Sequence, residues 1–506
     1  MKLGQLLAGI ESLDITGDVR EEISAVCYSA DQCREGSLFV AITGLKHDGH
    51  DFIGEAISRG AKCIVHEKDI KLLHPLTSVK VADSRRALGI LSKNYFSNPS
   101  SQLVLMAITG TSGKTTITYL LESILKAAGF KCGVLGTVNY RFNNKIEPAP
   151  NTTPESYELQ KILRIMADDG ITHVAAEVSS HAVDLRRVDD CDFDLGIFTN
   201  LSPEHLDYHK TMESYYQAKK RFFAEVLPQS SKEHVRKMVI NADDEWGRKI
   251  LEEVNVPALT YGLDKACDIK AQNYEFSLAG IRATIDLQGS IISIASPLIG
   301  KFNLYNILAA AGAAAILNVP PAIIREGIEN LSCVPGRLEK VDTNSGSYVF
   351  VDYAHKADAL AQVLQNLLQL KQKRIVTVFG CGGNRDRGKR PLMGDTATKY
   401  SDFTILTSDN PRLEEPLSII DEIEAGINKE KIRKVTSESR QLDNNVHCYT
   451  IIPDRKKAIE TAIAFARTGD IVLIAGKGHE DYQIVGTKKM PFDDRIVAAH
   501  ALKMKG

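Results

Sequence analysis

The stretch TGTSGKTT, residues 109–116, decides how the rest of the chain is interpreted. It looks like a phosphate-binding loop, G-x-x-x-x-G-K-[ST], but only two residues separate its first glycine from the Gly-Lys-Thr triplet. The apolar run at 103–108 predicts a buried strand, and the segment TTITYLLESILKAAG after the lysine predicts an amphipathic helix. Backbone N–H groups of such a loop can hold phosphate oxygens, while Lys114 offsets their charge and the Thr115 hydroxyl binds Mg²⁺. The stretch therefore predicts a nucleotide site; a glycine-rich turn before a surface helix is the alternative.

The chain around this loop is long enough for about three domains. Residues 1–98 alternate short apolar runs with helical patterns and end at a polar, proline-containing linker, which predicts a small α/β domain. A larger α/β domain is expected over 99–334; within it, residues 268–299 alternate apolar and polar side chains and predict an antiparallel patch. A third α/β domain is expected over 335–506. The strand candidates of the two larger domains lie at 103–108, 172–178, 194–199, 236–240, 348–352, 374–379, 403–407 and 471–475.

Composition and charge narrow the class of protein. The chain is 43% hydrophobic and 25% charged, as globular proteins are, and its 62 basic and 64 acidic side chains nearly cancel. No overall field therefore favours nucleic acid or an anionic membrane. The nine cysteines form no C-x-x-C pair, and the apolar run at 304–324 contains asparagines and a proline pair, which indicates a buried helix ending near Leu317. We expect a cytoplasmic protein that binds no nucleic acid and does not insert into membranes.

Polar side chains follow two of the predicted strands of the central domain. Glu177 ends the strand in ITHVAAEVSSH, and His205 follows the strand in DLGIFTNLSPEHLDYH. In an open parallel sheet, ligands bind beyond the carboxyl ends of the strands, so both side chains can face the phosphates and hold a second cation. The alternative, to which we give equal weight, is that Glu177 caps a helix and His205 makes only local hydrogen bonds.

Ten segments, in order along the chain, resemble the Mur ligase family, the ATP-dependent amide-bond-forming enzymes of peptidoglycan synthesis. They are NTTPES, EVSSH, TNLSPEHLDYH, YYQAKKRFF, GKFNLYNILAA, PGRLE, VDYAH, GCGGNRDRGKRPLMG, SDNPRLEEP and AGKGHEDYQ. The shortened GTSGKTT loop is that family's form of the phosphate cradle. The last three segments resemble the members that add the third residue to UDP-N-acetylmuramoyl-L-alanyl-D-glutamate. The resemblance implies a UDP-sugar-binding N-terminal domain, a central ATP-binding domain with a mostly parallel P-loop-type sheet, and a Rossmann-like C-terminal domain that binds the amino acid.

The implied reaction needs ATP and Mg²⁺. The γ-phosphoryl group passes to the D-Glu side-chain carboxylate, and the amine of the incoming amino acid attacks the resulting acyl phosphate. By resemblance, Thr115 serves one Mg²⁺, and Glu177 and His205 serve the other. Lys219 in YYQAK matches the lysine that this family carries as a carbamate, although a solvated helix lysine is the default without the resemblance and Lys220 stands beside it. The implied catalytic residues are Lys114, Glu177, His205 and Lys219.

The resemblance also implies binding residues for the two large substrates. For ATP they are Gly110, Thr111, Ser112, Gly113, Lys114, Thr115, Thr116, Asn306, Arg337, Asp352 and His355. For the UDP-sugar dipeptide they are Ser29, Leu45, Lys46, His47, Asn151, Thr152, Thr153, Ser179, Leu185 and Arg187. The chain departs from the family pattern at Ala30, Leu185, Lys356 and Ala357.

The motif SDNPRLEEP carries the argument for the added amino acid. Meso-diaminopimelate differs from lysine by a carboxylate at its far end, which an arginine can bind through two hydrogen bonds, so Arg412 is the natural discriminator. Alone, Asn410-Pro411 is an ordinary turn pair. GCGGNR is no dinucleotide fingerprint, because Arg385 stands where the last glycine of G-x-G-x-x-G is required. The implied amino-acid-binding residues are Arg385, Asp409, Asn410, Pro411, Arg412, Gly476 and Glu480.

Other functions stay open from the sequence. The same reaction with L-lysine, or another ligase of this architecture such as a folylpolyglutamate synthase, is the nearest alternative. A P-loop ATPase or kinase would leave the third domain without a role, and a nonenzymatic nucleotide-binding module would not need Glu177, His205 and Lys219 together. The expected partners are small-molecule substrates, the UDP-N-acetylmuramoyl dipeptide and meso-diaminopimelate, and a monomer is expected.

Overall fold

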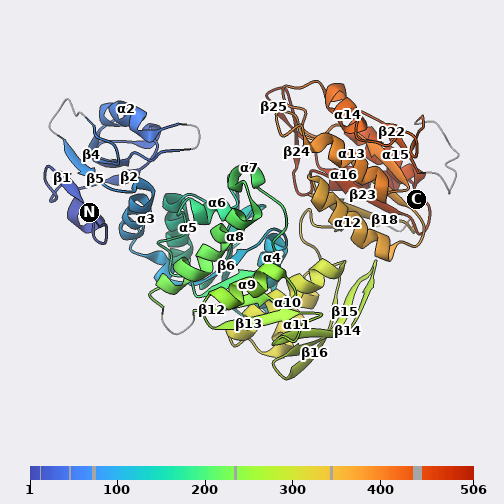
Figure 1. Ribbon diagram of the computed structural model, residues 1–506, viewed down its shortest axis with the longest axis horizontal. Coiled ribbons are helices and arrows are strands. Elements are labelled where there is room, and N and C mark those ends of the chain that lie inside the picture. The colour runs from blue at the N-terminus through green and yellow to red at the C-terminus, as the bar shows by residue number, and fades with distance from the viewer. Residues whose placement is uncertain are drawn as a thin grey trace. The chain divides into compact units, whose positions relative to one another are not determined.

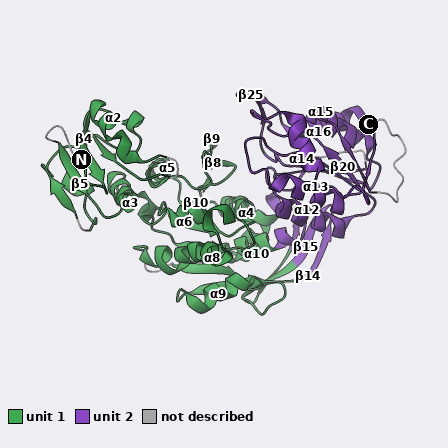
Figure 2. Ribbon diagram, turned by 45° about the horizontal axis from the view of Figure 1, so that its top comes forward, with its two compact units in different colours: residues 1–272, 284–293, 305–328 green, residues 273–283, 294–304, 329–506 purple. Residues whose placement is uncertain are grey.

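The computed structural model describes residues 1–11, 13–44, 47–70, 76–232, 236–341, 346–436 and 447–505. The chain divides into two compact units (Figure 2). Unit 1 comprises residues 1–272, 284–293 and 305–328, and unit 2 comprises residues 273–283, 294–304 and 329–506. The division runs through the segment predicted to be an antiparallel patch. The three predicted domains are each α/β, while their boundaries at 98/99 and 334/335 stay predictions. Leu45 and Lys46 lie outside the described residues.

A five-stranded sheet near the N-terminus forms the first α/β layer of unit 1 (Figure 1). Its order is β1-β5-β4-β3-β2, and all neighbours are parallel except β1, which pairs antiparallel with β5. The strands are β1 (Asp14–Thr16), β2 (Ala25–Cys27), β3 (Ser37–Val40), β4 (Ala61–His66) and β5 (Thr77–Lys80). The helices are α1 (Leu3–Leu6), η1 (Ala30–Gln32), η2 (Gly49–Phe52), α2 (Ile53–Ser58), α3 (Ser84–Tyr95) and η3 (Pro99–Gln102).

The largest sheet has the order β16-β15-β14-β13-β12-β11-β6-β10-β7-β8-β9. The strands at 132–135 and 258–262 were not predicted, and the other four central strands nearly coincide with those predicted at 103–108, 172–178, 194–199 and 236–240. All six central strands are parallel and mostly apolar. They are β6 (Val104–Thr109), β7 (Cys132–Leu135), β10 (His173–Glu177), β11 (Leu195–Phe198), β12 (Lys237–Asn241) and β13 (Ala258–Gly262). At one edge, β8 (Asn139–Phe142) and β9 (Lys145–Pro148) are antiparallel. At the other, two-residue connections join β14 (Ile269–Ser277), β15 (Gly280–Leu287) and β16 (Ser290–Ser296), and so short a connection joins only antiparallel strands. The predicted antiparallel patch is confirmed.

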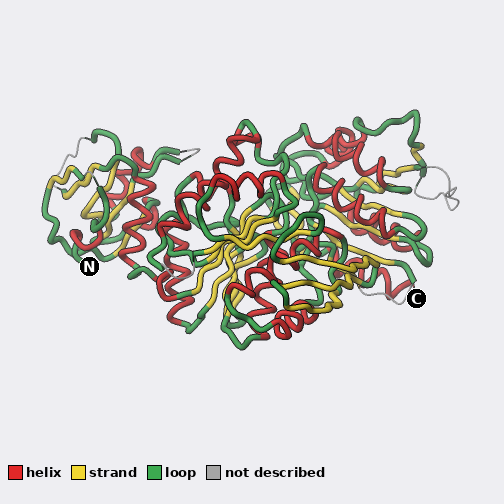
Figure 3. The backbone as a smooth tube through the Cα atoms, turned by 60° about the horizontal axis from the view of Figure 1, so that its bottom comes forward, coloured by secondary structure: helices red, strands yellow, loops and turns green. Residues whose placement is uncertain are grey.

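Helices cover the parallel strands of this sheet, which alternate with them along the chain (Figure 3). They are α4 (Lys114–Ala127), α5 (Ser156–Asp168), α6 (Ser180–Asp184), α7 (Leu206–His209), α8 (Met212–Arg221), η4 (Phe222–Val226), η5 (Leu227–Gln229), α9 (Glu245–Glu253), α10 (Lys301–Ile316) and α11 (Pro321–Asn330). α10 ends where the apolar run predicted a buried helix to end. None of the helices in the described ranges is both long and apolar enough to cross a membrane.

Unit 2 contains a seven-stranded sheet of order β17-β18-β23-β19-β20-β22-β21, in which only β17 is antiparallel to its neighbour. Its strands are β17 (Glu339–Val341), β18 (Tyr348–Asp352), β19 (Ile375–Phe379), β20 (Phe403–Leu406), β21 (Arg433–Lys434), β22 (Cys448–Ile451) and β23 (Ile471–Ala475). A separate hairpin joins β24 (Tyr482–Val485) to β25 (Lys488–Pro491). The helices are α12 (Ala357–Leu370), α13 (Lys389–Tyr400), α14 (Pro416–Glu424), α15 (Arg455–Phe465) and α16 (Asp494–Lys505).

Two hydrophobic clusters, one on each face of this sheet, explain its layered form. Leu360 of α12, Met393 of α13 and Ile420 of α14 belong to one cluster, and Ile459 of α15 and Ala498 of α16 belong to the other. A sheet buried on both faces by helices is the doubly wound architecture, in which ligands bind beyond the carboxyl ends of the strands. The predicted Rossmann-like domain is therefore present.

Candidate active site

The phosphate loop has the predicted strand–loop–helix form. β6 ends at Thr109, and α4 begins at Lys114. Gly110 and Gly113 between them have φ values of +140° and +93°, which favour glycine. A Cβ atom would stand 1.9 Å from Thr199 Oγ1 at the first and 2.3 Å from Asn306 Oδ1 at the second. Both the backbone conformation and the lack of room for a Cβ atom require glycine at these two positions. Thr199 and Asn306, from neighbouring elements, therefore pack closely against the loop.

The Lys114 ammonium is fixed against the backbone of this loop. Its ammonium donates to the carbonyl oxygens of Gly110, at 2.9 Å, and Thr111, at 2.8 Å. Asn200 and Thr199, at the end of β11, complete the cradle: the Thr111 and Ser112 amides donate to Asn200 oxygens at 2.8 and 3.0 Å. The loop thus presents a cation and an ordered backbone where a polyphosphate would bind.

Glu177 lies beside the loop, as its place at a strand end predicted. It is buried, and its carboxylate accepts hydrogen bonds from the Thr115 hydroxyl at 2.9 Å, the Thr137 amide at 3.0 Å and the Thr137 hydroxyl at 2.9 Å. Thr115 and Glu177 offer the hard oxygen donors that Mg²⁺ prefers. Mg²⁺ binds through one or two carboxylates plus phosphate and water oxygens. This suits the described residues, which contain no cage of three or more His, Cys, Asp or Glu side chains.

Lys219, on α8, also faces the loop. Its side chain is 1% exposed, and its Nζ donates to the Gly110 carbonyl oxygen at 2.9 Å. Burial, together with the nearby charge of Lys114, holds the pKa of Lys219 well below its usual value, which favours the uncharged amine more than in an exposed lysine. The neighbouring Lys220 instead pairs with Glu253 at 2.8 Å. Of the two adjacent lysines, Lys219, the one that the resemblance implies, is the one at the phosphate loop.

His205 begins α7 with a left-handed backbone, φ +57°. Its ring lies 4.9 Å from the ring of His181, centroid to centroid. The ring of His209, 5.5 Å from that of His181, shares a hydrogen bond with the Ser180 hydroxyl at 2.9 Å. A histidine cluster therefore covers the start of α6, the helix that follows Glu177.

The central residues predicted for the UDP-sugar dipeptide gather at the end of β10. The Thr153 hydroxyl donates to the Glu177 carbonyl oxygen at 2.8 Å and accepts from the Ser179 amide at 3.1 Å, and Arg187 donates to the Thr153 carbonyl oxygen at 3.2 Å. The Thr152 hydroxyl shares a hydrogen bond with that of Thr137 at 3.0 Å. Tyr140 donates to the Asn151 carbonyl oxygen, Leu185 ends α6, and Ser29 and His47 belong to the N-terminal sheet domain.

The residues predicted for the amino acid meet in unit 2. Asn410 Nδ2 donates to Glu480 Oε2 at 2.9 Å, and Arg412 Nη1 donates to the Gly383 carbonyl oxygen at 2.8 Å. A Cβ on Gly476 would stand 3.0 Å from Asp409 Oδ2, and one on Gly382 would lie 3.0 Å from Arg412 and 3.7 Å from Arg385. Unit 2 thus contains both guanidinium groups and carboxylates among these residues, as an amino acid with charges at both ends requires.

The three predicted ATP residues of unit 2 lie at the end of β18. Asp352 accepts from the Leu338 and Ala354 amides at 2.7 and 2.8 Å, which fixes its carboxylate. The Arg337 guanidinium lies 5.3 Å from the centre of the Tyr353 ring. His355 Nδ1 is 2.9 Å from the Tyr353 carbonyl oxygen, and burial lowers the pKa of His355 to about 4, so its ring is neutral.

Sequence reasoning missed two residues of these sites. Thr137, in LGTVN after β7, binds Glu177, and its position at the carboxyl end of a parallel strand was the available signal. Lys477 is fully buried and donates to Glu480 at 3.0 Å and to Asn410 at 3.3 Å. The contact between Lys477 and Asn410 joins residues far apart along the chain, and no spacing in the sequence indicates it.

Three family models match the chain: a Mur ligase catalytic domain over residues 22–96, a Mur ligase middle domain over 108–314, and a Mur ligase glutamate ligase domain over 336–478. The chain belongs to the Mur ligase family. It is 44% identical to the UDP-N-acetylmuramoyl-L-alanyl-D-glutamate–2,6-diaminopimelate ligase of Geobacter metallireducens, over 99% of this chain and 98% of the relative. It is also 44% identical to the enzyme of that name from Geobacter sulfurreducens, over 99% of both chains.

Solved structures agree with this assignment. A structure described as UDP-N-acetylmuramoyl-L-alanyl-D-glutamate–2,6-diaminopimelate ligase superposes with a TM-score of 0.71 at 30% identity, over 100% of this chain and 99% of that chain. A Mycobacterium tuberculosis folylpolyglutamate synthase gives a TM-score of 0.59 at 15% identity, over 82% of this chain and 93% of that one, which shows a shared fold alone.

Proposed function

We propose that this chain joins meso-2,6-diaminopimelate to the D-Glu side-chain carboxylate of UDP-N-acetylmuramoyl-L-alanyl-D-glutamate, with ATP and Mg²⁺. The observation that carries the proposal is the cluster of Arg412, Asn410 and Glu480 in unit 2. A guanidinium suits the distal carboxylate of diaminopimelate, and a carboxylate suits its distal ammonium. L-Lysine has no such carboxylate, so it would leave the Arg412 guanidinium without that partner. The full-length relatives at 44% identity, which carry this ligase's name, support the same substrate.

The proposed chemistry assigns a task to each group at the phosphate loop. The loop amides and Lys114 bind the ATP phosphates, and the γ-phosphoryl group passes to a carboxylate oxygen of D-Glu as ADP leaves. The diaminopimelate amine then attacks the acyl carbon, and phosphate leaves as the amide bond forms. Thr115 and Glu177 would hold Mg²⁺, which offsets the negative charge of the phosphates when bound. His205 remains a proposed ligand for the second ion.

The lowered pKa of the buried Lys219 supports its proposed carbamylation. A neutral amine adds to CO₂ with formation of an N–C bond and loss of one proton, which an ammonium cannot do. The product is an anion at the phosphate loop, carboxylate-like and able to join Thr115 and Glu177 in holding a cation. The proposed residues for ATP, the UDP-sugar dipeptide and diaminopimelate are those inferred from the sequence, and we propose a cytoplasmic, monomeric enzyme with domain boundaries near residues 98 and 334.

A paired assay tests this function. Purified protein is incubated with ATP, Mg²⁺ and UDP-N-acetylmuramoyl-L-alanyl-D-glutamate, and with either meso-diaminopimelate or L-lysine, and phosphate release and product mass are measured. We expect phosphate and the tripeptide mass with diaminopimelate alone. If product also forms with lysine at a similar rate, the protein is a ligase but the proposed specificity for diaminopimelate is rejected. No product with either amino acid would reject the proposed function.

A further inference from the structure

The guanidinium of Arg390 is fully buried and belongs to none of the predicted sites. Arg390, in the first turn of α13, has 0% side-chain exposure. Its Nη1 donates to Glu414 Oε2 at 2.9 Å and to Glu422 Oε2 at 2.8 Å, and its Nη2 donates to Glu414 Oε1 at 2.9 Å. Glu414 thus receives both nitrogens of the fork, which is the strongest geometry of an arginine–carboxylate pair.

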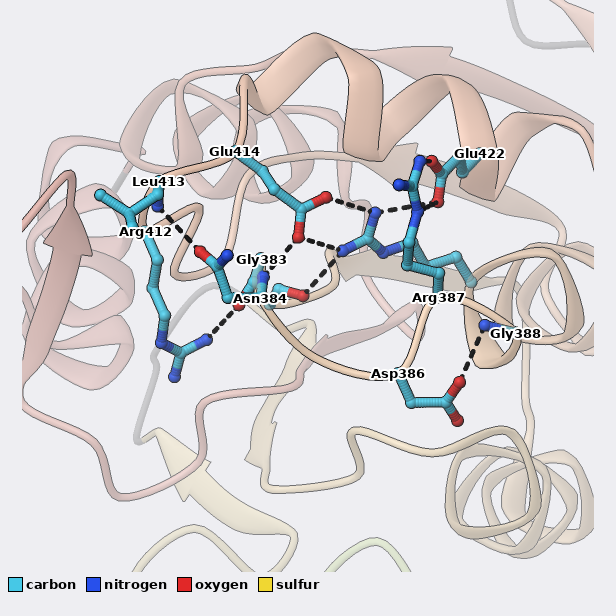
Figure 4. Close-up of polar contacts among 11 residues, drawn as sticks. Gly383, Asn384, Asp386, Arg387, Gly388, Arg412, Leu413, Glu414 and Glu422 are labelled. Atoms are coloured by element: carbon cyan, nitrogen blue, oxygen red, sulfur yellow. Dashed lines mark hydrogen bonds and ion pairs between the residues drawn. The ribbon is translucent and has the colours of Figure 1, made fainter. Parts of the chain in front are cut away.

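Through Glu414 this guanidinium joins two loops, residues 382–388 and residues 409–415. The Asn384 amide donates to Glu414 as well, and the Asn384 side-chain oxygen accepts from the Leu413 amide at 3.0 Å. Arg390 Nη2 also reaches the Gly382 carbonyl oxygen at 3.3 Å. In Figure 4 these contacts connect Arg412 with Gly383, Leu413 with Asn384, and Asn384 with Glu414. The first loop carries Arg385 and the second carries Arg412, so the contacts set the spacing of the two arginines.

Arg412 needs such support because its own backbone is unfavourable. Its φ of +54° lies in the left-handed region, which an arginine rarely adopts. Its amide donates to the Ile484 carbonyl oxygen at 3.1 Å, and the Gly486 amide donates to its carbonyl oxygen at 2.7 Å. The backbone of Arg412 is therefore held by the β24–β25 hairpin, and the two residues after it, Leu413 and Glu414, are held by the first loop.

We propose that Arg390 and Glu414 are positioning residues for diaminopimelate: they lock residues 409–415 onto residues 382–388 and so hold Arg412 where it meets the distal carboxylate. The inference rests on the proposed function and extends it to two residues that touch no substrate. Loss of Glu414 leaves Arg390 paired with Glu422 alone, and loss of Arg390 leaves Glu414 without its two-nitrogen partner, so either change removes the contact that joins the two loops. A guanidinium displaced by about 1 Å weakens a charge-assisted hydrogen bond and loses near-attack geometry.

The test compares three variants by steady-state kinetics with each substrate varied in turn. Glu414→Gln keeps the shape of the side chain and removes its charge, and Arg390→Lys keeps the charge and removes the fork. For both we expect the KM for diaminopimelate to rise by roughly 10-fold to 100-fold. The KM values for ATP and for the UDP-sugar dipeptide should stay within about 2-fold, because the phosphate loop is in unit 1 and the ATP residues proposed in unit 2 lie at the end of β18, outside residues 382–388 and 409–415. The preference for diaminopimelate over lysine should fall in parallel.

Arg387→Gln is the matched control. Arg387 is an exposed arginine three positions before Arg390, and it pairs with Glu422 but makes no contact with Glu414 among its described hydrogen bonds and ion pairs. Its KM for diaminopimelate should be unchanged. A similar rise in all three variants, or a fall in kcat with no change of any KM, would overturn the positioning role.

The same experiment separates this inference from the proposed function. Wild-type protein that makes no tripeptide rejects the function, whereas active wild type with an unaltered KM in Glu414→Gln rejects only the inference. Thermal unfolding of each variant checks that it is folded. If Arg390→Lys does not fold, Glu414→Gln decides the outcome, since Glu414 lies at the edge of the cluster with 23% side-chain exposure.

Discussion

The proposed specificity for diaminopimelate depends on one side chain, that of Arg412. We expect Arg412→Ala to raise the KM for meso-diaminopimelate by about 100-fold, the effect of losing a charge-assisted hydrogen-bond pair, with ATP affinity changed by less than about 2-fold. Because alanine is strained at a φ of +54°, Arg412→Asn is measured beside it, since asparagine tolerates the left-handed region. Isothermal titration with ATP and steady-state kinetics with diaminopimelate give the two values. Equal losses of both would make Arg412 a structural residue.

Lys219 gives a second prediction at the residue scale. Lys219→Ala should lower kcat by about 100-fold or more, because it removes the proposed carbamate, a negatively charged group, from the phosphate loop. Carbon-13 NMR of protein in ¹³C-labelled bicarbonate should show a carbamate resonance that this variant lacks. Lys220→Ala is the control, since Lys220 pairs with Glu253, and it should retain both activity and the resonance. Loss of the resonance in Lys220→Ala instead would contradict the assignment to Lys219.

Among the elements, the packing of α11 on α4 holds the phosphate-loop helix in place. A Cβ on Gly327 would stand 2.3 Å from Ile124 Cα, and the Ser123 hydroxyl donates to the Gly327 carbonyl oxygen at 2.6 Å. Alanine normally stabilises a helix by about 1 kcal/mol relative to glycine. Here the two backbones must separate, so we expect Gly327→Ala to destabilise unit 1 by about 2 kcal/mol and to weaken ATP binding.

Gly54→Ala is the control for that measurement. Gly54 lies in α2, and nothing stands within 4 Å of the position of its added Cβ, so alanine should be neutral or slightly stabilising there. Chemical denaturation of both variants gives the comparison. A stable Gly327→Ala variant with normal ATP affinity would show that the two helices can move apart at no cost.

At the scale of the whole molecule, each unit has hydrophobic clusters of its own, and all described diaminopimelate residues lie in unit 2. We therefore expect scanning calorimetry to resolve two transitions, of which Gly327→Ala lowers the one that belongs to unit 1. Diaminopimelate at about 100 times its Kd should stabilise the unit 2 transition alone, by about 2.7 kcal/mol. L-Lysine at the same concentration should shift neither. A single transition that diaminopimelate shifts as a whole would mean that the units unfold together.

The sequence by itself determined the features that depend on near neighbours along the chain. The strand–loop–helix around TGTSGKTT, the eight strands predicted in the two larger domains and the antiparallel patch at 268–299 follow from local periodicity and glycine positions, and all are present, whereas β7, β13 and β22 were not predicted. The family, and the residues expected to bind each substrate, were inferred from the resemblance to Mur ligases. Glu177 could be placed beside the phosphates because parallel strands end at one edge of a sheet.

Only the tertiary structure decided which polar groups meet across distant segments. It put Lys219 rather than Lys220 against the loop, Thr137 on Glu177, and Lys477 between Asn410 and Glu480. Arg390 follows another basic residue, Lys389, and it is buried because Glu414 and Glu422 lie opposite it. Burial of a charge depends on the position of its counter-charge in space, and the chain order of those residues carries no trace of it.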